Sequence, residues 1–444
     1  MIKVETEVLV IGRGMAGVMA ASTLAKNGVD VTIVAKSYGA TALSSGCLDI
    51  LGYIPEVQGV AQPPFSGFKY LVVSNRNHPY LIAGEGDPKK AEDIIREAFD
   101  SLPEQIKNLH VGSVENNSWV LTSFGTLRPT AFVQKPLEPA IITGEKESIL
   151  LTGIKGLFEL NPVFASSIAM KDLKSRSLGY VKVKPAYVSI RSLEGAQYLA
   201  IPLVSTVLEE DEEFDEFKKE LVKLAKRENP DTILLPSIFS TPNLVEKMKE
   251  LEDACKCRIG EVPTPPESAS GLRLQRALNN VCSTLGIKVF HATDLKPEVE
   301  NGIVKRIVGT RRTLLFTEAR KIVFEAEKYV LATGDLIGEG ITCDVDEELN
   351  VAFRETVFDL PLYIPEGPIA TTDPFNPAGQ NFSKIGINVN SEMQPVDSAG
   401  RVVYENLFAA GSIIGHYDYN AEKCGMGVAI TTGYKAAKSI LSRR

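Results

Sequence analysis

Three glycines near the start of the chain, Gly12, Gly14 and Gly17, have the spacing of a phosphate-binding turn. They follow the apolar run TEVLVI (6–11) and open a helix-like segment at 15–27. In such a strand–turn–helix, the first glycine permits the turn, the second admits a pyrophosphate and the third lets helix and strand pack closely. The free N–H groups of the helix end favour an anion. The pattern predicts a nicotinamide or flavin site, with a close-packed turn that binds nothing as the alternative.

The residues at the end of the second predicted strand separate these two cofactor classes. That strand is VDVTIVAK (29–36), and it follows Gly28, which ends the helix. An acidic residue usually stands at its end and binds the adenosine ribose of a nicotinamide cofactor. Here Ala35 and Lys36 occupy that place. Their presence disfavours a nicotinamide cofactor and leaves room for a flavin.

Four later segments carry small residues where a flavin would pass. TALSSGCLD (41–49) follows the second strand, YVLATG (329–334) and NLFAAGSIIG (406–415) each end a strand, and CGMG (424–427) opens the last helix. The N-terminus of that helix would stabilise negative charge on a reduced flavin. With Lys36, the cofactor-binding residues predicted in these segments are Ser44, Ser45, Gly46, Thr333, Gly334, Gly411, Gly425 and Gly427.

The bulk composition is that of a globular protein without a broad nucleic-acid surface. The chain has 444 residues, enough for two or three domains, and is 44% hydrophobic and 23% charged. Its net charge of −8 argues against nucleic-acid binding. Its six cysteines include no C-x-x-C, so we expect a reducing compartment and neither a metal site nor an iron–sulfur cluster. No apolar stretch approaches the length of a membrane-spanning helix, and we expect a cytoplasmic protein.

The elements that must position these turns alternate between strand and helix, which predicts an α/β fold with a parallel sheet. We expect a Rossmann-like flavin-binding fold with an inserted α+β cap domain. The flavin would lie across the carboxyl ends of the parallel strands. The predicted division is a discontinuous flavin-binding domain of residues 1–55, 265–345 and 383–444, a substrate or cap region of 56–264, and a further excursion on the cap side at 346–382.

Several segments together carry a resemblance to a known family. They are the glycine turn, SSGCLDILG (44–52), HPY (78–80), GTLRPT (125–130), PTPPESASGLRLQ (263–275), LATG (331–334) and FAAGSIIGHYD with CGMG (408–427). The chain resembles the B subunits of the anaerobic glycerol-3-phosphate dehydrogenases, a branch of the flavoproteins that include fumarate reductase and succinate dehydrogenase. The resemblance runs from residue 8 to about residue 440 and is thinnest over 165–228. It implies that the Rossmann-like fold is of the fumarate reductase and glutathione reductase type.

This resemblance implies a flavin-bearing subunit of a dehydrogenase complex that oxidises sn-glycerol 3-phosphate to dihydroxyacetone phosphate and passes electrons toward quinone. The family is associated with FMN, whereas the glycine turn in this architecture implies FAD, so both cofactors stay open. The implied partners are a catalytic flavoprotein subunit and an iron–sulfur subunit that anchors the complex to the inner membrane. The alternatives are a non-catalytic electron-relay or assembly subunit, and a stand-alone flavoprotein similar to fumarate reductase.

Three residues are candidates for catalysis. Arg128, which precedes Pro129, could bind a phosphate or carboxylate with two hydrogen bonds, or form a surface ion pair. Arg273, in the first turn of a predicted helix, could reach the flavin or an anion, or have a structural role. Asp418 could line the flavin ring. We assign no catalytic role to the neighbouring His416.

Two cysteines, Cys47 and Cys424, lie in segments that we place near the flavin. They could form a redox disulfide, but buried free thiols are the preferred interpretation.

Overall fold

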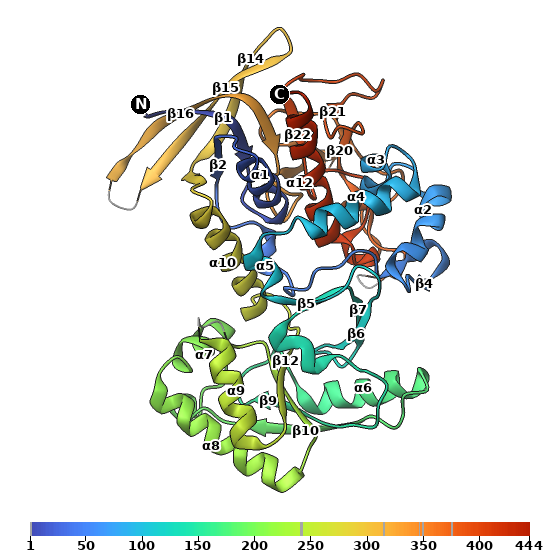
Figure 1. The fold of residues 1–444 in the computed structure, drawn as a ribbon, viewed down its shortest axis with the longest axis vertical. Helices are drawn as coiled ribbons and strands as arrows, with labels where there is room; N and C mark the ends of the chain where they lie inside the picture. The colour runs from blue at the N-terminus through green and yellow to red at the C-terminus, as the bar shows by residue number, and fades with distance from the viewer. Residues whose placement is uncertain (1, 240–242, 314–315, 346, 349, 374–375) are drawn as a thin grey trace. The chain divides into compact units, whose positions relative to one another are not determined.

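The computed structural model describes residues 2–239, 243–313, 316–345, 347–348, 350–373 and 376–444 (Figure 1). The chain forms two compact units. The first consists of Met1–Thr41, Asp49–Asn108 and Ala277–Arg444, and the second of Ala42–Leu48 and Leu109–Arg276.

A seven-stranded sheet forms the centre of the first unit, in the order β13-β2-β1-β16-β15-β14, with β22 also paired to β16. Strands β13, β2, β1, β16 and β22 run parallel, and β14, β15 and β16 form an antiparallel meander. Strands β2 (VTIVA) and β22 (LFA) are buried along their whole length because all but one of their residues are apolar, whereas β13 (KVFH), at the edge of the sheet, is largely exposed. The bounds of the strands are β1 Ile2–Ile11, β2 Val31–Ala35, β13 Lys288–His291, β14 Thr293–Glu300, β15 Ile303–Thr313, β16 Phe316–Leu331 and β22 Leu407–Ala409.

Two helices of small and apolar residues pack together in this unit, α1 (Met15–Lys26) and α12 (Gly425–Ser442) (Figure 1). Their backbones approach closely, because a Cβ on Gly433 would lie 2.5 Å from the carbonyl oxygen of Ala16. Helix α12 also contacts α3 (Pro79–Ala83) and α4 (Pro88–Asp100).

The remaining elements of the first unit are short. They are β3 Tyr53–Ile54, β4 Gly59–Val60, α2 Phe68–Ser74, α5 Glu104–Lys107, β17 Ile341–Val345, β18 Val351–Glu355, β19 Leu362–Tyr363, β20 Gly386–Val389, β21 Pro395–Val396 and α11 Tyr419–Glu422.

The second unit contains a four-stranded parallel sheet in the order β10-β9-β11-β12. The chain passes from β9 to β10 on one side and then returns to β11 on the other side of β9, as in doubly wound α/β folds. The strands are β9 Ser148–Ile154, β10 Lys182–Val188, β11 Thr232–Pro236 and β12 Arg258–Val262, and the helices are α6 Pro162–Ser175, α7 Ile201–Val207, α8 Asp211–Glu228 and α9 Leu244–Cys255. Two short ribbons accompany them, formed by β5 His110–Gly112 with β8 Phe132–Gln134 and β6 Ser118–Leu121 with β7 Leu127–Thr130.

The two units divide the chain at different points from the predicted domains. Residues 56–108, which we expected in the cap, belong to the first unit. The reason is packing, because α3 and α4 lie against α12. The second division falls within α10 (Ala269–Thr284), between Arg276 and Ala277. The four-stranded sheet of the second unit is entirely parallel, with helices between its strands, so its character is α/β rather than the predicted α+β.

Candidate functional site

Two of the three glycines in the first turn are required by packing within the chain. Gly12 has φ +116°, and a Cβ on it would overlap the carbonyl oxygen of Ala332. A Cβ on Gly17 would overlap the carbonyl oxygen of Gly12. The Gly12 N–H donates to the carbonyl oxygen of Val34 at 2.8 Å. The turn is therefore held between β2 and the end of β16.

Gly14 differs from both of these glycines. It is the N-cap of α1, with φ −74° and ψ −174°, a conformation that any L-residue adopts. A Cβ on it would meet only the Oγ1 of Thr41, at an ordinary 3.4 Å. Among the described residues, packing does not explain this glycine. A group outside the chain that approaches the backbone at the positive end of α1 does explain it, and the pyrophosphate of a dinucleotide is such a group.

Two further turns lie at the same edge of the sheet. Residue pairs Ile11–Leu331 and Leu331–Ala409 are in register, so β1, β16 and β22 end side by side. Thr333 and Gly334 follow β16 directly, and Gly411 follows β22. This arrangement brings the predicted residues of 12–17, 333–334 and 411 to one edge.

The Thr333–Gly334 turn contains a hydroxyl that the chain does not satisfy. The Oγ1 of Thr333 is buried and has no hydrogen-bond partner among the described residues. A buried polar atom without a partner is unfavourable, so a ligand group or an ordered water is expected there. By contrast, the Gly411 N–H donates to Thr432 Oγ1 at 2.9 Å, and a Cβ on Gly411 would lie 2.8 Å from the Cβ of Ala16. Gly411 therefore has a packing role, whereas Thr333 and Gly14 fit a bound dinucleotide.

Lys36 has a carboxylate partner within the first unit. Its Nζ forms an ion pair with Glu339, and both side chains are exposed. Close by, the guanidinium of Arg13 lies 4.0 Å from the ring centre of Tyr38, and its Nε donates to the carbonyl oxygen of Ser37 at 3.1 Å. The end of β2 is therefore cationic, which agrees with the absence of a ribose-binding acid from this strand.

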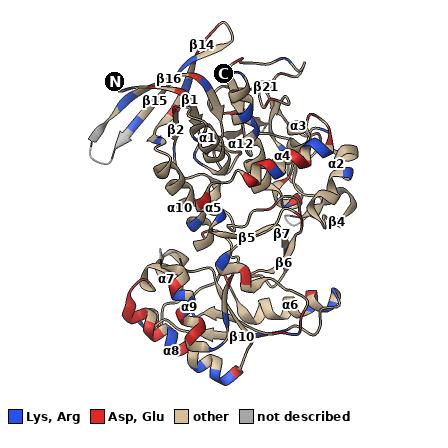
Figure 2. Ribbon diagram, in the orientation of Figure 1, with Lys and Arg blue, Asp and Glu red and all other residues tan. Residues whose placement is uncertain are grey.

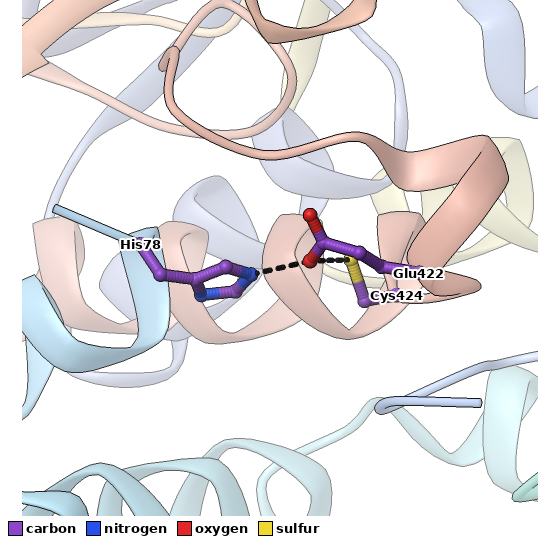
Figure 3. A group of neighbouring side chains, drawn as sticks. All are labelled: His78, Glu422 and Cys424. Carbon is purple, nitrogen blue, oxygen red and sulfur yellow. Dashed lines mark hydrogen bonds and ion pairs between the residues drawn. The ribbon is translucent and has the colours of Figure 1, made fainter. Parts of the chain in front are cut away.

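Three buried side chains, His78, Glu422 and Cys424, lie together beside the N-terminus of α12 (Figure 3). His78 is the N-cap of α3, and Cys424 is the N-cap of α12. The Nε2 of His78 lies 2.9 Å from Glu422 Oε2, and the Cys424 thiol donates to the same oxygen at 3.5 Å. Sequence reasoning missed the His78–Glu422 pair because 344 residues separate its members.

The hydrogen bonds of this cluster do not fit a metal ion. The N–H of Tyr80 donates to His78 Nδ1 at 3.2 Å, so Nδ1 carries no proton and Nε2 carries one. A neutral histidine that bound a metal through Nε2 would need its proton on Nδ1, where it would face the Tyr80 N–H. Glu422 instead accepts hydrogen bonds from His78, from Cys424 and from the Asp418 N–H at 2.8 Å.

The start of α12 is largely occupied by the chain itself. The Gly427 N–H donates to the carbonyl oxygen of Asp49 at 2.7 Å, and a Cβ on Gly427 would overlap Tyr80 Oη. Tyr80 Oη donates to the carbonyl oxygen of Ile50 at 2.7 Å. A Cβ on Gly425 would lie 3.0 Å from that of Tyr419. Gly427 thus has a packing role at the position where we predicted a flavin contact.

Burial shapes the titration of two groups around this helix start. It raises the pKa of the Cys424 thiol and of the Tyr80 hydroxyl well above their ordinary values, and the nearby Glu422 raises both further. Cys424 is a free cysteine and so is Cys47, and both are buried. The preferred interpretation of buried free thiols agrees with the structure.

Asp418 is bound to backbone groups of its own unit. Its Oδ1 caps α11 by accepting from the N–H groups of Asn420 and Ala421, and its Oδ2 accepts from the Gln380 N–H at 2.8 Å. The side chain is 1% exposed. These bonds give Asp418 a structural role in joining residue 380 to α11.

Two further titratable residues lie close to these segments. Asp335 follows Gly334, and burial raises its pKa, a feature that sequence reasoning missed although the residue directly adjoins a predicted turn. His416 has φ +72°, its ring stacks on Tyr363 with 3.7 Å between centroids, and its Nε2 lies 2.6 Å from Asn388 Oδ1. Burial lowers the pKa of His416 to about 4, so the ring is neutral at pH 7.

The remaining predicted residues belong to the second unit, and two of them meet there. Arg128 Nη1 donates to Ser45 Oγ at 2.6 Å. The carbonyl oxygen of Gly46 lies 2.8 Å from His110 Nε2, and the Ser44 carbonyl oxygen accepts from Ser268 Oγ at 3.0 Å. This cluster joins the S-S-G segment to the segments of 125–130 and 263–275, three of those that carry the family resemblance.

Arg273 forms a buried ion pair. Its Nη2 lies 2.6 Å from Glu261 Oε2, with side chains 5% and 0% exposed. Its Nε donates to Gln134 Oε1 at 2.8 Å and its Nη1 to the Phe239 carbonyl oxygen at 2.5 Å. The second carboxylate oxygen of Glu261 accepts two backbone N–H groups at 3.0 Å. These contacts support the structural alternative for Arg273.

A parallel sheet with glycine turns gathered at its carboxyl edge defines an α/β dinucleotide-binding protein. The family model described as FAD binding domain matches residues 7–428, and the chain belongs to that family. This membership confirms the predicted α/β FAD-binding fold.

Full-length relatives confirm the family resemblance stated from the motifs. The chain is 28% identical to the B subunit of the probable anaerobic glycerol-3-phosphate dehydrogenase of Halobacterium salinarum, with 98% of this chain and 97% of the relative aligned. It is 26% identical to the B subunit of the Vibrio cholerae enzyme, over 98% and 96% of the two chains. A solved structure of a flavocytochrome c3 fumarate reductase in its open conformation is 11% identical, with a TM-score of 0.41, covering 99% of this chain and 79% of that one. Among the described residues, no helix is both long and apolar enough to cross a membrane.

Proposed function

We propose that this chain is the flavin-bearing subunit of a glycerol-3-phosphate dehydrogenase complex, and that its flavin is FAD. The observation that carries the flavin site is the pair of open features at one sheet edge, Gly14 without a packing reason and Thr333 Oγ1 without a partner. Gly14 at the start of α1 supports FAD over FMN, because FMN has no pyrophosphate for that turn to hold. The substrate rests on the names of the relatives, and the passage of electrons toward quinone rests on the family resemblance of the sequence motifs.

The chain's own residues would have separate tasks. The N-terminus of α1 and the backbone at Gly14 would hold the pyrophosphate, and Thr333 Oγ1 would bind a polar group of the cofactor. When bound, the flavin supplies a two-electron acceptor for oxidation of a secondary alcohol. Arg128 Nη1 donates to Ser45 Oγ at 2.6 Å. The planar guanidinium of an arginine can donate two parallel hydrogen bonds to a phosphate, such as that of the substrate. We propose Arg128 as the phosphate-binding residue and leave Arg273 and Asp418 as positioning residues.

A second candidate function is electron relay or assembly without dehydrogenase activity of its own. It is favoured by the engagement of Arg273 and Asp418 with protein groups of their own units. In that case a catalytic flavoprotein subunit would hold the substrate, and an iron–sulfur subunit would anchor the assembly.

The test begins with the purified chain. Its cofactor is released by denaturation, and FAD is separated from FMN by chromatography; we expect FAD. The holoprotein is then mixed with sn-glycerol 3-phosphate without oxygen. Bleaching of the flavin by the chain alone supports a dehydrogenase with its own site, whereas bleaching only after the partner subunits are added supports the relay. A chain that contains no flavin would overturn both proposals.

A further inference from the structure

An ion pair joins two loops that leave the sheet on either side of the glycine turn. Lys36 directly follows β2, and Glu339 lies in the loop that follows β16. The Nζ of Lys36 pairs with the carboxylate of Glu339. Strands β2 and β16 are the two neighbours of β1, and both are in register with Ile11, the last residue of β1. The pair therefore lies at the sheet edge where the glycine turn begins.

The loop that carries Glu339 packs directly on the Thr333–Gly334 turn. Glu339 stands between two glycines, Gly338 and Gly340. A Cβ on Gly338 would lie 2.5 Å from the carbonyl oxygen of Thr333. A Cβ on Gly340 would lie 2.0 Å from the carbonyl oxygen of Gly334. These contacts fix the glutamate beside the turn in which Thr333 Oγ1 has no partner among the described residues.

The stability of the fold gains little from a glutamate at this position. Glu339 has φ +57°, a left-handed conformation that glycine or asparagine adopts with less strain. Its side chain is 59% exposed and that of Lys36 is 62% exposed. An ion pair so open to solvent contributes little to the free energy of unfolding. A residue in a strained conformation without a stabilising role is a candidate for a binding role.

Other exposed ion pairs of the first unit are local, and this one is not. Figure 2 shows basic and acidic residues together on α4, where Lys89 pairs with Asp93 one helical turn away at 3.1 Å. The members of the Lys36–Glu339 pair are 303 residues apart in the sequence. The fold brings them together only at the edge where the dinucleotide is expected.

We propose that Glu339 binds the adenosine ribose of FAD in place of the acid that β2 lacks. The end of β2 carries Ala35 and Lys36 where a ribose-binding acid usually stands. Glu339 brings a carboxylate to the same place from the loop after β16, and an ionised carboxylate accepts hydrogen bonds from hydroxyl groups such as those of a ribose. Lys36 is a positioning residue, because its ammonium group orients this carboxylate. The inference rests on the proposed function, since FAD contains an adenosine ribose and FMN does not.

The test measures flavin binding to the full-length chain after its flavin has been removed. Glu339→Gln should bind FAD about tenfold more weakly than the parent chain, because a hydrogen bond to a charged acceptor is lost. The second ligand is an FAD analogue whose adenosine lacks the 2′ and 3′ hydroxyl groups. The parent should bind this analogue about tenfold more weakly than FAD, whereas Glu339→Gln should bind the two alike. A structural role for Glu339 would not remove this discrimination.

Two further variants serve as controls, and each is first checked for an unchanged melting temperature. Asp93→Asn breaks the Lys89–Asp93 pair, which is exposed to a similar extent at 68% and 54%, and should bind FAD like the parent. Lys36→Gln keeps the carboxylate, so it should retain the discrimination against the analogue and lose less than about fivefold in FAD affinity.

Three results would overturn the role of Glu339. They are equal FAD affinity of Glu339→Gln and the parent, a Glu339→Gln chain that still discriminates against the analogue, and a Lys36→Gln chain that does not. A parent chain that binds FMN but not FAD would instead contradict the proposed FAD site itself, so the two failures are distinguishable.

Discussion

The carbonyl oxygen of Ala332 occupies the place that a Cβ on Gly12 would need, whereas a Cβ on Gly14 would meet only Thr41 Oγ1, at an ordinary 3.4 Å. One glycine of the turn therefore serves the packing of β1 against the end of β16. We propose that the other, Gly14, serves a bound group that is not part of the chain. The stability of the turn and its binding of a flavin therefore depend on different glycines. One substitution at each glycine can measure the two properties separately.

Gly14→Ala is expected to fold normally and to lose flavin. The backbone of Gly14 is allowed for alanine, and Thr41 Oγ1 lies at an ordinary 3.4 Å from the added carbon, so the melting temperature of the apoprotein should change by no more than a few degrees. The added methyl group would stand where the pyrophosphate approaches, so the FAD content per chain should fall at least tenfold. Absorbance at 450 nm and thermal unfolding of the flavin-free protein give the two values.

The matched substitution is Gly12→Ala, which we expect to lower the stability of the fold itself. It places a Cβ against the Ala332 carbonyl and forces φ +116° on an alanine, so we expect a loss of several kcal/mol and little folded protein. Equal flavin content in Gly14→Ala and the parent chain would contradict the assigned role of Gly14.

Breaking the buried ion pair of the second unit should be strongly destabilising. Glu261→Gln leaves the Arg273 guanidinium without its charge partner at 0% and 5% side-chain exposure, and we expect a loss of about 3–5 kcal/mol in the free energy of unfolding. The double variant Glu261→Leu, Arg273→Met removes both charges and should lose less than the sum of its two single variants. Urea unfolding monitored by circular dichroism provides the comparison, and additive losses would show that the pair is not coupled.

The stability of the protein should fall between pH 6.5 and pH 4 because of His416. Its pKa is lowered from 6.5 to about 4 by burial, so the unfolded chain takes up a proton in this range and the folded chain does not. The stabilising contribution is complete above pH 6.5 and is lost as the pH falls, by about 2 kcal/mol when the partial exposure of the ring is allowed for. Urea unfolding at pH 7.0 and pH 5.0 measures the loss.

His416→Asn is the control, because asparagine tolerates φ +72° and does not titrate. Its stability should depend less on pH over the same range. If the parent and the variant lose equal stability between pH 7.0 and pH 5.0, the loss belongs to other groups.

One cysteine should react rapidly with a thiol reagent at pH 8. Cys343 is exposed, whereas burial raises the pKa of Cys424 well above its ordinary value and that of Cys257 to about 11. We expect one fast thiol per folded chain, absent in Cys343→Ser and retained in Cys424→Ser. After unfolding without a reductant, six thiols should react. Four would indicate a disulfide and contradict the free state of the cysteines in the structure.

Local sequence patterns predicted the first βαβ unit well. The helix expected at 15–27 is α1, Met15–Lys26, and the strand expected at 29–36 is β2, Val31–Ala35. The glycine spacing located the turn between them.

The parts that the sequence did not predict depend on contacts between distant segments. The run SILLTGI (148–154) is a buried strand, but only its pairing with β10 and β11 shows that the second unit has a parallel sheet. From the sequence, Arg273 is a candidate ligand-binding residue, but in the structure its guanidinium forms an ion pair with Glu261. Likewise, Gly427 fits a flavin contact in the sequence, but in space Tyr80 Oη lies against it. No local pattern contains these neighbours.

The register between β1 and β16 has a consequence for how the chain reaches its fold. Ile2 pairs with Ile322, so during synthesis some 320 residues must follow the start of β1 before its partner strand β16 exists. Contacts between residues so far apart in sequence slow folding. The chain loses the conformational entropy of the intervening loop before the strand pairing can stabilise the fold. During synthesis, the apolar edge of β1 and β2 is exposed, and it is the segment we expect chaperones to cover.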